Sequence, residues 1–311
     1  MTRSHLIIGG GGFIGRNVAL QLSALGDNVL LAGRHPPAGE KLAGPAGRIP
    51  FELVELGSAD WDRLVANVDV VHHYAWGSLP ASANANPGGD LASNVGPLIA
   101  MLEALQRRGG GRVIFSSSGG TVYGRPQQIP VQEDHALAPI NAYGAGKATA
   151  EIYLTLFRRM HGMDCRIARI SNPFGAGQNI SRGQGAVTTF IHHALANEPI
   201  NIWGTGAVVR DYIHISDAAK CLVNLANAPR HAEHIFNIGS GVGVSLNDIV
   251  AELESCLGRT LNVKRTEPRP IDVPVSVLSI DRAREILGWA PELSFAEGIL
   301  KTLNDLSTSF L

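Results

Sequence analysis

Two side chains that could exchange a proton lie four residues apart in "NAYGAGKATAE", residues 141–151. Tyr143 and Lys147 would share one face of a helix, because side chains at this spacing are neighbours. A nearby ammonium favours the phenolate and lowers a tyrosine pKa from about 10 towards neutrality. Such a tyrosine would be a general base for a substrate hydroxyl. Most Tyr–Lys pairs at this spacing are two solvated side chains, so the surroundings of the pair decide between the two interpretations.

The surroundings favour chemistry, because a glycine-rich turn lies upstream of the pair. The apolar segment 5–9 runs into "GGGGFIGRNVALQL", in which Gly9, Gly12 and Gly15 are three residues apart. Glycines let the backbone approach a pyrophosphate, which the N-terminus of the following helix attracts. A glycine triplet alone predicts only a tight turn. Its place between the first strand and the first helix indicates a dinucleotide site.

The end of the second strand bears on the type of dinucleotide. Gly33 stands where NAD-binding folds usually carry an acid for the ribose hydroxyls, and Arg34 follows it. A guanidinium suits a 2′-phosphate, so the sequence slightly favours NADP over NAD. The alternative is that Arg34 stacks on adenine or lies in solvent. Glu55, near the end of "FELVEL", is predicted to bind the adenine amino group.

Short apolar runs that alternate with helical patterns must position these groups. The runs lack polar alternation, which indicates strands buried on both faces of a parallel sheet. The predicted fold class is α/β, a doubly wound parallel sheet of the Rossmann type with a smaller C-terminal substrate-binding lobe. The expected strands are 5–9, 28–33, 51–56, 68–76, 112–118, 165–171 and 234–239, and the expected helices are 13–26, 94–109, 216–228, 245–258 and 281–289.

Composition excludes several classes of protein. The 311 residues carry a formal net charge of -1, which suggests no nucleic-acid-binding surface. Three scattered cysteines predict a reduced, cytoplasmic protein, and no apolar run approaches the length of a membrane span. His72 and His73 are expected to be cofactor-pocket and core groups, because no third ligand has a suitable spacing for a metal.

The motifs together resemble the extended short-chain dehydrogenases/reductases, and within them the nucleotide-sugar epimerases and dehydratases of the UDP-glucose 4-epimerase type. The resemblance covers essentially the whole chain. It implies a dinucleotide-binding domain at 1–171 and 212–239, a nucleotide-sugar-binding lobe at 172–211 and 240–311, and a homodimer paired through helices near 94–108 and 141–160. The motifs that carry it are "GGGGFIG", "VVHHYAW", "FSSSGGTVYG", "PINAYGAGK", "RISNPFGAGQ", "VVRDYIHISDAA" and "RPIDVPVSVLSIDRAREILGW".

The resemblance implies a role for each catalytic residue. Tyr143 would be the acid/base, and Lys147 would bind the nicotinamide ribose and tune Tyr143. A hydroxyl at the end of the fifth strand would bridge to the sugar: Ser118 when aligned from "FSSS", but Gly119 when counted back from "VYG". We expect Ser118, with Thr121 as its substitute. The cofactor-binding residues implied are Gly9, Gly12, Phe13, Ile14, Gly15, Arg34, Glu55, Ala75, Asn94, Tyr143 and Lys147.

The second half of the chain is similar to a nucleotide-diphosphate site. Arg210 and Arg269 match family arginines that hold the diphosphate; the alternative is ion pairs with Asp211 and Asp272. The other substrate-binding residues implied are Thr121, Asn172, which lies near the same group, Gln178, which shapes the nucleotide pocket with "SRGQGAV", and Trp203, which lines its base end.

Three hypotheses about function follow: a 4-epimerase, another nucleotide-sugar enzyme (a reductase or a dehydratase), and a non-enzymatic cofactor sensor. A 4-epimerase is the first expectation, with an NADP-dependent 4-keto-nucleotide-sugar reductase as the runner-up. A 4,6-dehydratase of this family would carry Asp-Glu just before "VYG", where this chain has Gly120 and Thr121. A non-enzymatic cofactor sensor on the same fold would usually lose the tyrosine.

Overall fold

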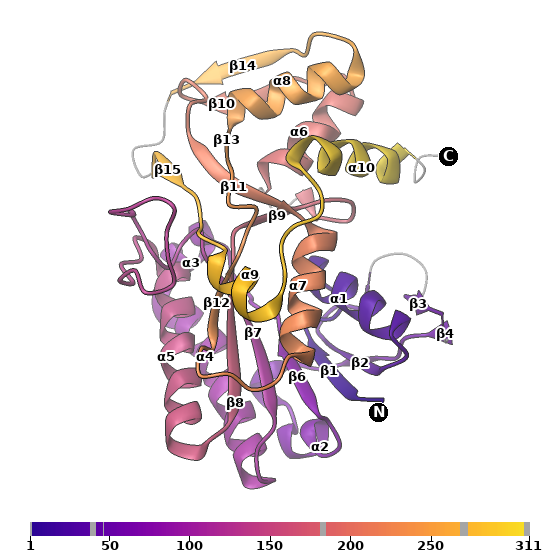
Figure 1. Ribbon diagram of the computed structural model, residues 1–311, viewed down its shortest axis with the longest axis vertical. Helices are drawn as coiled ribbons and strands as arrows, with labels where there is room; N and C mark the ends of the chain where they lie inside the picture. Colours follow the sequence, from indigo (N-terminus) through magenta and orange to yellow (C-terminus); the bar gives the residue numbers. More distant parts are fainter. Residues whose placement is uncertain (1, 38–41, 46, 181–184, 268–272, 308–311) are drawn as a thin grey trace. The chain divides into compact units, whose positions relative to one another are not determined.

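The chain forms two compact units in a computed structural model that describes residues 2–37, 42–45, 47–180, 185–267 and 273–307 (Figure 1). Unit 1 comprises Met1–Gly124, Ala136–Arg169 and Ala219–Phe236. Unit 2 comprises Arg125–His135, Ile170–Ala218 and Asn237–Leu311. The units differ from the expected domain bounds chiefly at residues 125–135 and 212–218, which belong to unit 2.

A seven-stranded sheet dominates unit 1, in the order β12-β8-β7-β6-β1-β2-β5. The chain adds β2 and β5 on one side of β1, then returns to add the remaining strands on the other side, and the pairs around β1 are parallel. This is a doubly wound parallel sheet, so the predicted fold class is confirmed. The strands are β1 (Ser4–Ile8), β2 (Asn28–Gly33), β5 (Phe51–Leu53), β6 (Val70–His73), β7 (Arg112–Ser118), β8 (Asp164–Ile170) and β12 (Ile235–Ile238).

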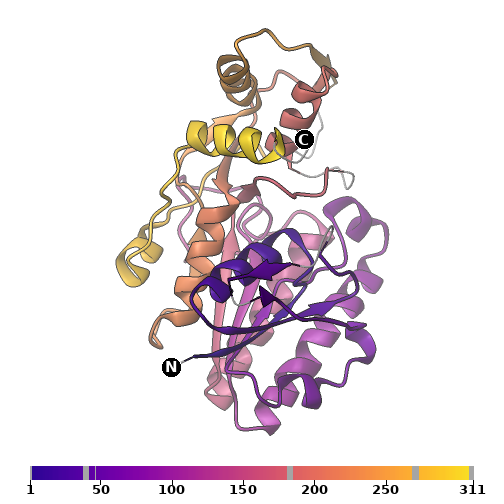
Figure 2. The same ribbon diagram turned by 90° about the vertical axis from the view of Figure 1, so that its right-hand side faces the viewer.

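Helices lie on both faces of this sheet (Figure 2). Leu6, Ile8 and Phe115 belong to a fully buried core that continues into α2, α4 and α5, whereas α1 packs on β1 and β2. The helices and short elements are α1 (Phe13–Ala24), β3 (Ala43–Gly44), β4 (Gly47–Arg48), η1 (Leu56–Ser58), α2 (Trp61–Val65), α3 (Pro80–Ala85), α4 (Pro87–Arg107), α5 (Ala142–His161) and α7 (Ile215–Asn227).

Helix α5 has clear start and stop signals in the sequence. Asn141 is its N-cap, and the side-chain oxygen accepts a 2.8 Å hydrogen bond from the backbone N–H of Gly144. At the other end Gly162 adopts φ 63, the left-handed conformation that glycine tolerates, after a basic last turn that suits the helix dipole. Tyr143 and Lys147 therefore fall in the first two turns of a well-capped helix.

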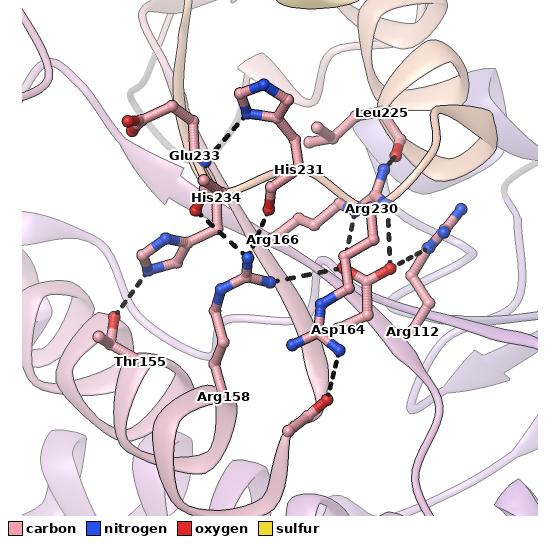
Figure 3. A network of polar contacts seen from close by, with 12 residues as sticks. Arg112, Thr155, Arg158, Asp164, Arg166, Leu225, Arg230, His231, Glu233 and His234 are labelled. Carbon is pink, nitrogen blue, oxygen red and sulfur yellow. Dashed lines mark hydrogen bonds and ion pairs between the residues drawn. The ribbon is translucent and has the colours of Figure 1, made fainter.

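A cluster of arginines surrounds Asp164, the first residue of β8 (Figure 3). Its carboxylate lies 2.8 Å from Arg112, 2.9 Å from Arg166 and 3.7 Å from Arg158. Arg166 also donates to the carbonyl of Leu225 near the end of α7. The network thus ties the amino-terminal ends of β7 and β8 to the end of a helix, where carbonyl groups would otherwise lack donors.

Unit 2 has its own small core, formed where α6, α8 and α10 pack together. Strand β11 pairs with β9, β13 and β15, and β10 pairs with β14. The elements are β9 (Asn172–Phe174), α6 (Ala186–Leu195), β10 (Ile200–Trp203), β11 (Val209–His214), β13 (Gly243–Ser245), α8 (Leu246–Leu257), β14 (Val263–Thr266), β15 (Val275–Ser276), α9 (Asp281–Leu287) and α10 (Phe295–Ser307).

Candidate active site

The turn between β1 and α1 has no room for a side chain at Gly9 or Gly15. A Cβ on Gly9, which has φ +83, would lie 2.6 Å from the backbone nitrogen of Ala75. A Cβ on Gly15 would lie 2.4 Å from the carbonyl oxygen of Gly9. Gly12 is the N-cap of α1 and offers no side-chain cap, so the first N–H groups of the helix lack an internal partner. This cradle fits the pyrophosphate of a dinucleotide.

Phe13 and Ile14, two further residues expected to contact the cofactor, form the first turn of α1 and are half-buried. Arg34 is exposed just beyond β2, and its Nη2 lies 3.6 Å from where a Cβ on Gly77 would be. Glu55 is exposed before the short helix η1. The expected strand 51–56 is too long, because β5 ends at Leu53 and the chain turns into η1.

Lys147 lies in a cage of aromatic rings. Its Nζ is 4.0 Å from the ring centroid of Trp76, 4.7 Å from that of Phe115 and 5.9 Å from that of Tyr143. The same atom donates a 2.7 Å hydrogen bond to the carbonyl of Ser116. Only 2% of Lys147 is exposed. The parallel strands β6 and β7 end here, so the Tyr–Lys pair lies at the carboxyl edge of the sheet, where α/β folds bind ligands.

Burial sets the pKa values of the pair. Burial, together with the charge of Asp90, raises the pKa of Tyr143 to about 12. Burial lowers the pKa of Lys147 to about 7, against the opposing influence of Glu151 and Asp90. The prediction that the tyrosine pKa is lowered towards neutrality is therefore wrong for the protein alone, because desolvation of the phenolate and the charge of Asp90 both raise it. Ionisation of Tyr143 near neutral pH needs a further positive charge, such as an oxidised nicotinamide.

The hydroxyl groups at the end of β7 have separate roles. The Ser117 hydroxyl donates to the buried carboxylate of Glu151 and serves the core. Ser118, the last residue of the strand, is half-buried, and its carbonyl accepts the N–H of Thr121. The Thr121 hydroxyl is buried and has no hydrogen-bond partner in the described structure. Thr121 lies against the first turn of α5, since its carbonyl oxygen would be 2.9 Å from a Cβ on Gly144. The choice between Ser118 and Thr121 stays a prediction.

Two residues near the pair were given no role from the sequence, Trp76 and Asp90. Asp90 on α4 is buried, and its Oδ1 accepts a 2.8 Å hydrogen bond from the amide of Asn94. The amide oxygen of Asn94 in turn accepts from the N–H of Gly77, also at 2.8 Å. The sequence signal was an acid four residues before Asn94, a spacing that places the two side chains on one face of a helix.

The histidines of β6 lie in the core. His72 bonds through one ring nitrogen to His5 at 3.0 Å and through the other to the Tyr74 hydroxyl at 2.7 Å. His73 is 1% exposed beside Phe115, and neither of its ring nitrogens has a partner in the described structure. No group of three or more potential ligands in the described part of the chain could hold a metal.

Asn172, Trp203 and Arg210, three of the expected substrate residues, lie on the short strands of unit 2, whereas Gln178 lies in the loop after β9. Arg210 is half-buried on β11 and donates to the carbonyl of Val273 at 2.5 Å. Trp203 ends β10 and is 44% exposed. Gln178 donates to the carbonyl of Pro173 at 3.2 Å.

Asp211, the proposed alternative partner of Arg210, is 1% exposed. Its carboxylate accepts from the N–H groups of Ser240 and Gly241, at 2.7 and 3.2 Å. Its carbonyl accepts from the side chain of Asn172 at 2.8 Å, which anchors that candidate residue. Arg269, Asp272 and most of "SRGQGAV" lie outside the described residues.

Residues 5–239 match the family described as the NAD dependent epimerase/dehydratase family. The chain belongs to this family. It is 32% identical over 307 residues to the UDP-glucose 4-epimerase of Mycolicibacterium smegmatis, covering 96% of both proteins. It is 34% identical over 241 residues to the dTDP-4-dehydro-6-deoxyglucose reductase of Escherichia coli, covering 77% of this chain and 75% of the relative. Its fold resembles the UDP-glucose 4-epimerase of Thermotoga maritima solved with UDP-glucose, with a TM-score of 0.92, 28% identity and coverage of 99% and 100%.

The family and the fold together show an enzyme of the extended short-chain dehydrogenase/reductase type that uses a nicotinamide cofactor. Among the described residues, no helix combines the length and apolar character that a membrane crossing needs.

Proposed function

We propose that the protein is a UDP-sugar 4-epimerase that acts by transient oxidation of the sugar at C4. The observation that carries this proposal is the pair Tyr143 and Lys147, enclosed at the carboxyl edge of the sheet in the same unit as the glycine cradle. The likeness to the 4-epimerase of M. smegmatis over nearly the whole of both chains supports it.

Each residue at the edge of the sheet has a task in this reaction. The β1–α1 turn would hold the cofactor pyrophosphate, with Ala75 and Asn94 beside the nicotinamide half. A bound nicotinamide supplies the chemistry of taking the C4 hydride and giving it back. Tyr143 accepts the proton of the C4 hydroxyl and later returns it, while Ser118 or Thr121 orients that hydroxyl. The aromatic cage around Lys147 excludes water.

The nucleotide half of the substrate is assigned to unit 2. Arg210 and Arg269 would hold the diphosphate, because a guanidinium binds such oxygens with two parallel hydrogen bonds. Asn172 would lie near the same group, Gln178 would shape the pocket, and Trp203 would line the base. The exposed indole of Trp203 suits stacking on a base.

The choice between NADP and NAD depends on Arg34. The exposed guanidinium of Arg34 beyond β2 supports NADP slightly, whereas the description of the family names NAD. Denaturation of the purified protein and chromatography of the released nucleotide decide the matter. Release of NAD alone would refute a 2′-phosphate role for Arg34.

A 4-keto-nucleotide-sugar reductase is the second candidate, favoured by the likeness to the E. coli reductase. The two functions separate when the protein is incubated with UDP-glucose, UDP-galactose and their N-acetyl forms. A 4-epimerase interconverts a pair of these sugars without added cofactor. Consumption of a keto sugar alone, with one NADPH oxidised per sugar, would replace the epimerase with the reductase.

We further propose that the protein is a cytoplasmic homodimer paired through α5. Ile152, Leu156 and Met160 recur every fourth residue and are 62%, 42% and 66% exposed. An apolar row of this kind on one helix is typical of a face that packs against another helix. The cytoplasmic location rests on the cysteines, which are free thiols in the structure.

A further inference from the structure

Two opposite charges are buried beside the aromatic cage, and neither has an ion-pair partner within 4.0 Å in the described part of the chain. Lys147 is 2% exposed and Asp90 is 7% exposed. Each side chain has a neutral hydrogen-bond partner: Lys147 donates to the carbonyl of Ser116, and the carboxylate of Asp90 accepts from the side-chain amide of Asn94. A buried charge is costly unless an opposite charge lies near. Each of these two charges would be less costly to bury with the other one nearby.

Gly146 is the residue of α5 that lies against the carboxylate of Asp90. A Cβ at this position on α5 would lie 3.3 Å from Oδ2 of Asp90 and 3.1 Å from a ring carbon of Trp76. The next residue is Lys147, whose Nζ lies over the same indole ring. The carboxylate, the indole and the ammonium therefore surround one turn of α5, and the missing side chain of Gly146 lets α4 approach.

The other titratable groups around Lys147 leave Asp90 as the uncompensated carboxylate. Glu151, one turn along α5, is bound by Arg169 through contacts of 2.7 and 3.1 Å, and both side chains are 3% exposed. His73 on β6 is kept neutral, since burial and the charge of Lys147 lower its pKa to about 3. Tyr143 on α5 is neutral in the protein alone.

We propose that Asp90 is the counter-ion of Lys147 and so a positioning residue of the proton-transfer pair. Its Oδ1 is fixed by Asn94, which leaves Oδ2 directed at the turn of α5 that carries Tyr143 and Lys147. The negative charge of Asp90 favours the protonated form of Lys147 against the effect of burial and opposes early ionisation of Tyr143. The role of Asp90 in catalysis rests on the proposed function, whereas its interaction with the charge of Lys147 does not.

NMR of the lysine side chains tests the pair without any substrate and without a reagent that must reach the buried Lys147. The folded protein is prepared with isotope-labelled lysine, and the chemical shift of the Lys147 Cε is followed across the neutral and alkaline range. Asp90→Asn keeps an acceptor for Asn94 and removes the charge, so the Lys147 pKa should fall by about one unit. Asp90→Glu keeps the charge and should retain the wild-type titration. Glu103→Gln, at an exposed acid on the same helix, is the matched control and should also leave it unchanged.

An unchanged titration in Asp90→Asn, or equal shifts in Asp90→Asn and Asp90→Glu, would overturn the proposal. Asp90→Ser serves as a second neutral variant if Asp90→Asn fails to fold, and it should show the same downward shift. Failure of the proposed function would be seen differently. No UDP-sugar would be converted, while the Lys147 titration still responded to Asp90. Where a UDP-sugar is converted, the pH–rate profile gives a second readout, which should move to lower pH in Asp90→Asn.

Discussion

Tyr143 carries the proposed proton transfer, because its phenol ring lies 5.9 Å from the Nζ of Lys147 at the carboxyl edge of the sheet. Its surroundings keep it protonated, so the tyrosine becomes a base only when positive charge is added next to it. The Tyr143 hydroxyl is therefore expected to stay protonated until the cofactor and the substrate are bound.

Removal of the phenol should separate catalysis from binding. Tyr143→Phe should lower kcat by about 10²–10⁴-fold, the usual contribution of a general acid–base. The cofactor should still copurify, because the glycine cradle is untouched. Tyr153→Phe, at a half-buried tyrosine on the same helix, is the matched control and should keep its activity. Substantial turnover by Tyr143→Phe would remove Tyr143 from the role.

His73 makes the stability of the protein depend on pH. Its pKa is about 3 in the folded protein and about 6.5 when unfolded, so between these values the unfolded chain binds more protons. Stability is therefore fully present above pH 6.5 and falls as the pH drops, by about 1.4 kcal/mol per unit for this residue.

Urea unfolding at about pH 7.5 and about pH 5 measures this effect. The difference between the two pH values should be about 2 kcal/mol smaller in His73→Leu than in the wild type. His161→Leu, at an exposed histidine, should leave the difference as it is. An equal pH dependence in His73→Leu and wild type would show that His73 is not buried as a neutral group.

The sequence predicts residues whose roles depend on local spacing. Gly9, Gly15, Tyr143 and Lys147 are of this kind, since each belongs to a pattern within one turn or one helix. Asp90 acts through contacts between α4, α5 and the segment after β6, and a single sequence does not show which residues such elements bring together. The predicted pKa of Tyr143 was wrong for the same reason, because the sequence shows which residues are charged but not which are buried.

At the scale of elements, long buried strands and capped helices are predictable. Residues 28–33 and 112–118 form strands with the expected bounds. The strands of unit 2, with two to six residues each, are too short to show a period, and α6 and α10 were missed there. Their placement depends on packing in the unit 2 core rather than on local pattern.

The cluster around Asp164 should hold the ends of β7, β8 and α7 together. Although burial opposes it, pairing with Arg166 and Arg112 lowers the pKa of Asp164. Asp164→Asn would leave buried guanidinium groups without their carboxylate and should cost about 3–5 kcal/mol of unfolding free energy.

Asp62→Asn is the matched control for this cluster. It removes a surface pair with Arg107 whose side chains are 66% and 53% exposed, and should cost at most about 1 kcal/mol. Chemical denaturation of both variants gives the comparison. Equal losses in the two variants would contradict a structural role for the cluster.

At the scale of the whole molecule, the apolar row on α5 predicts the state of assembly. Leu156→Glu places a charge in the proposed interface and should convert a dimer into a monomer. Light scattering after size exclusion measures the mass. Lys301→Glu, at an exposed position on α10, should remain dimeric. A wild-type protein that is monomeric at high concentration would refute the proposed pairing.

In the proposed reaction, the C4 hydride leaves the sugar and returns to the same carbon within one bound complex. Incubation of the purified protein with UDP-glucose deuterated at C4, without added cofactor, tests it most directly. Tyr143 exchanges only the hydroxyl proton with water, so the product UDP-galactose should retain the deuterium at C4, as seen by mass spectrometry and NMR. Loss of the label to solvent, or no 4-epimer from any of the four UDP-sugars, would rule out a 4-epimerase that acts by hydride transfer at C4.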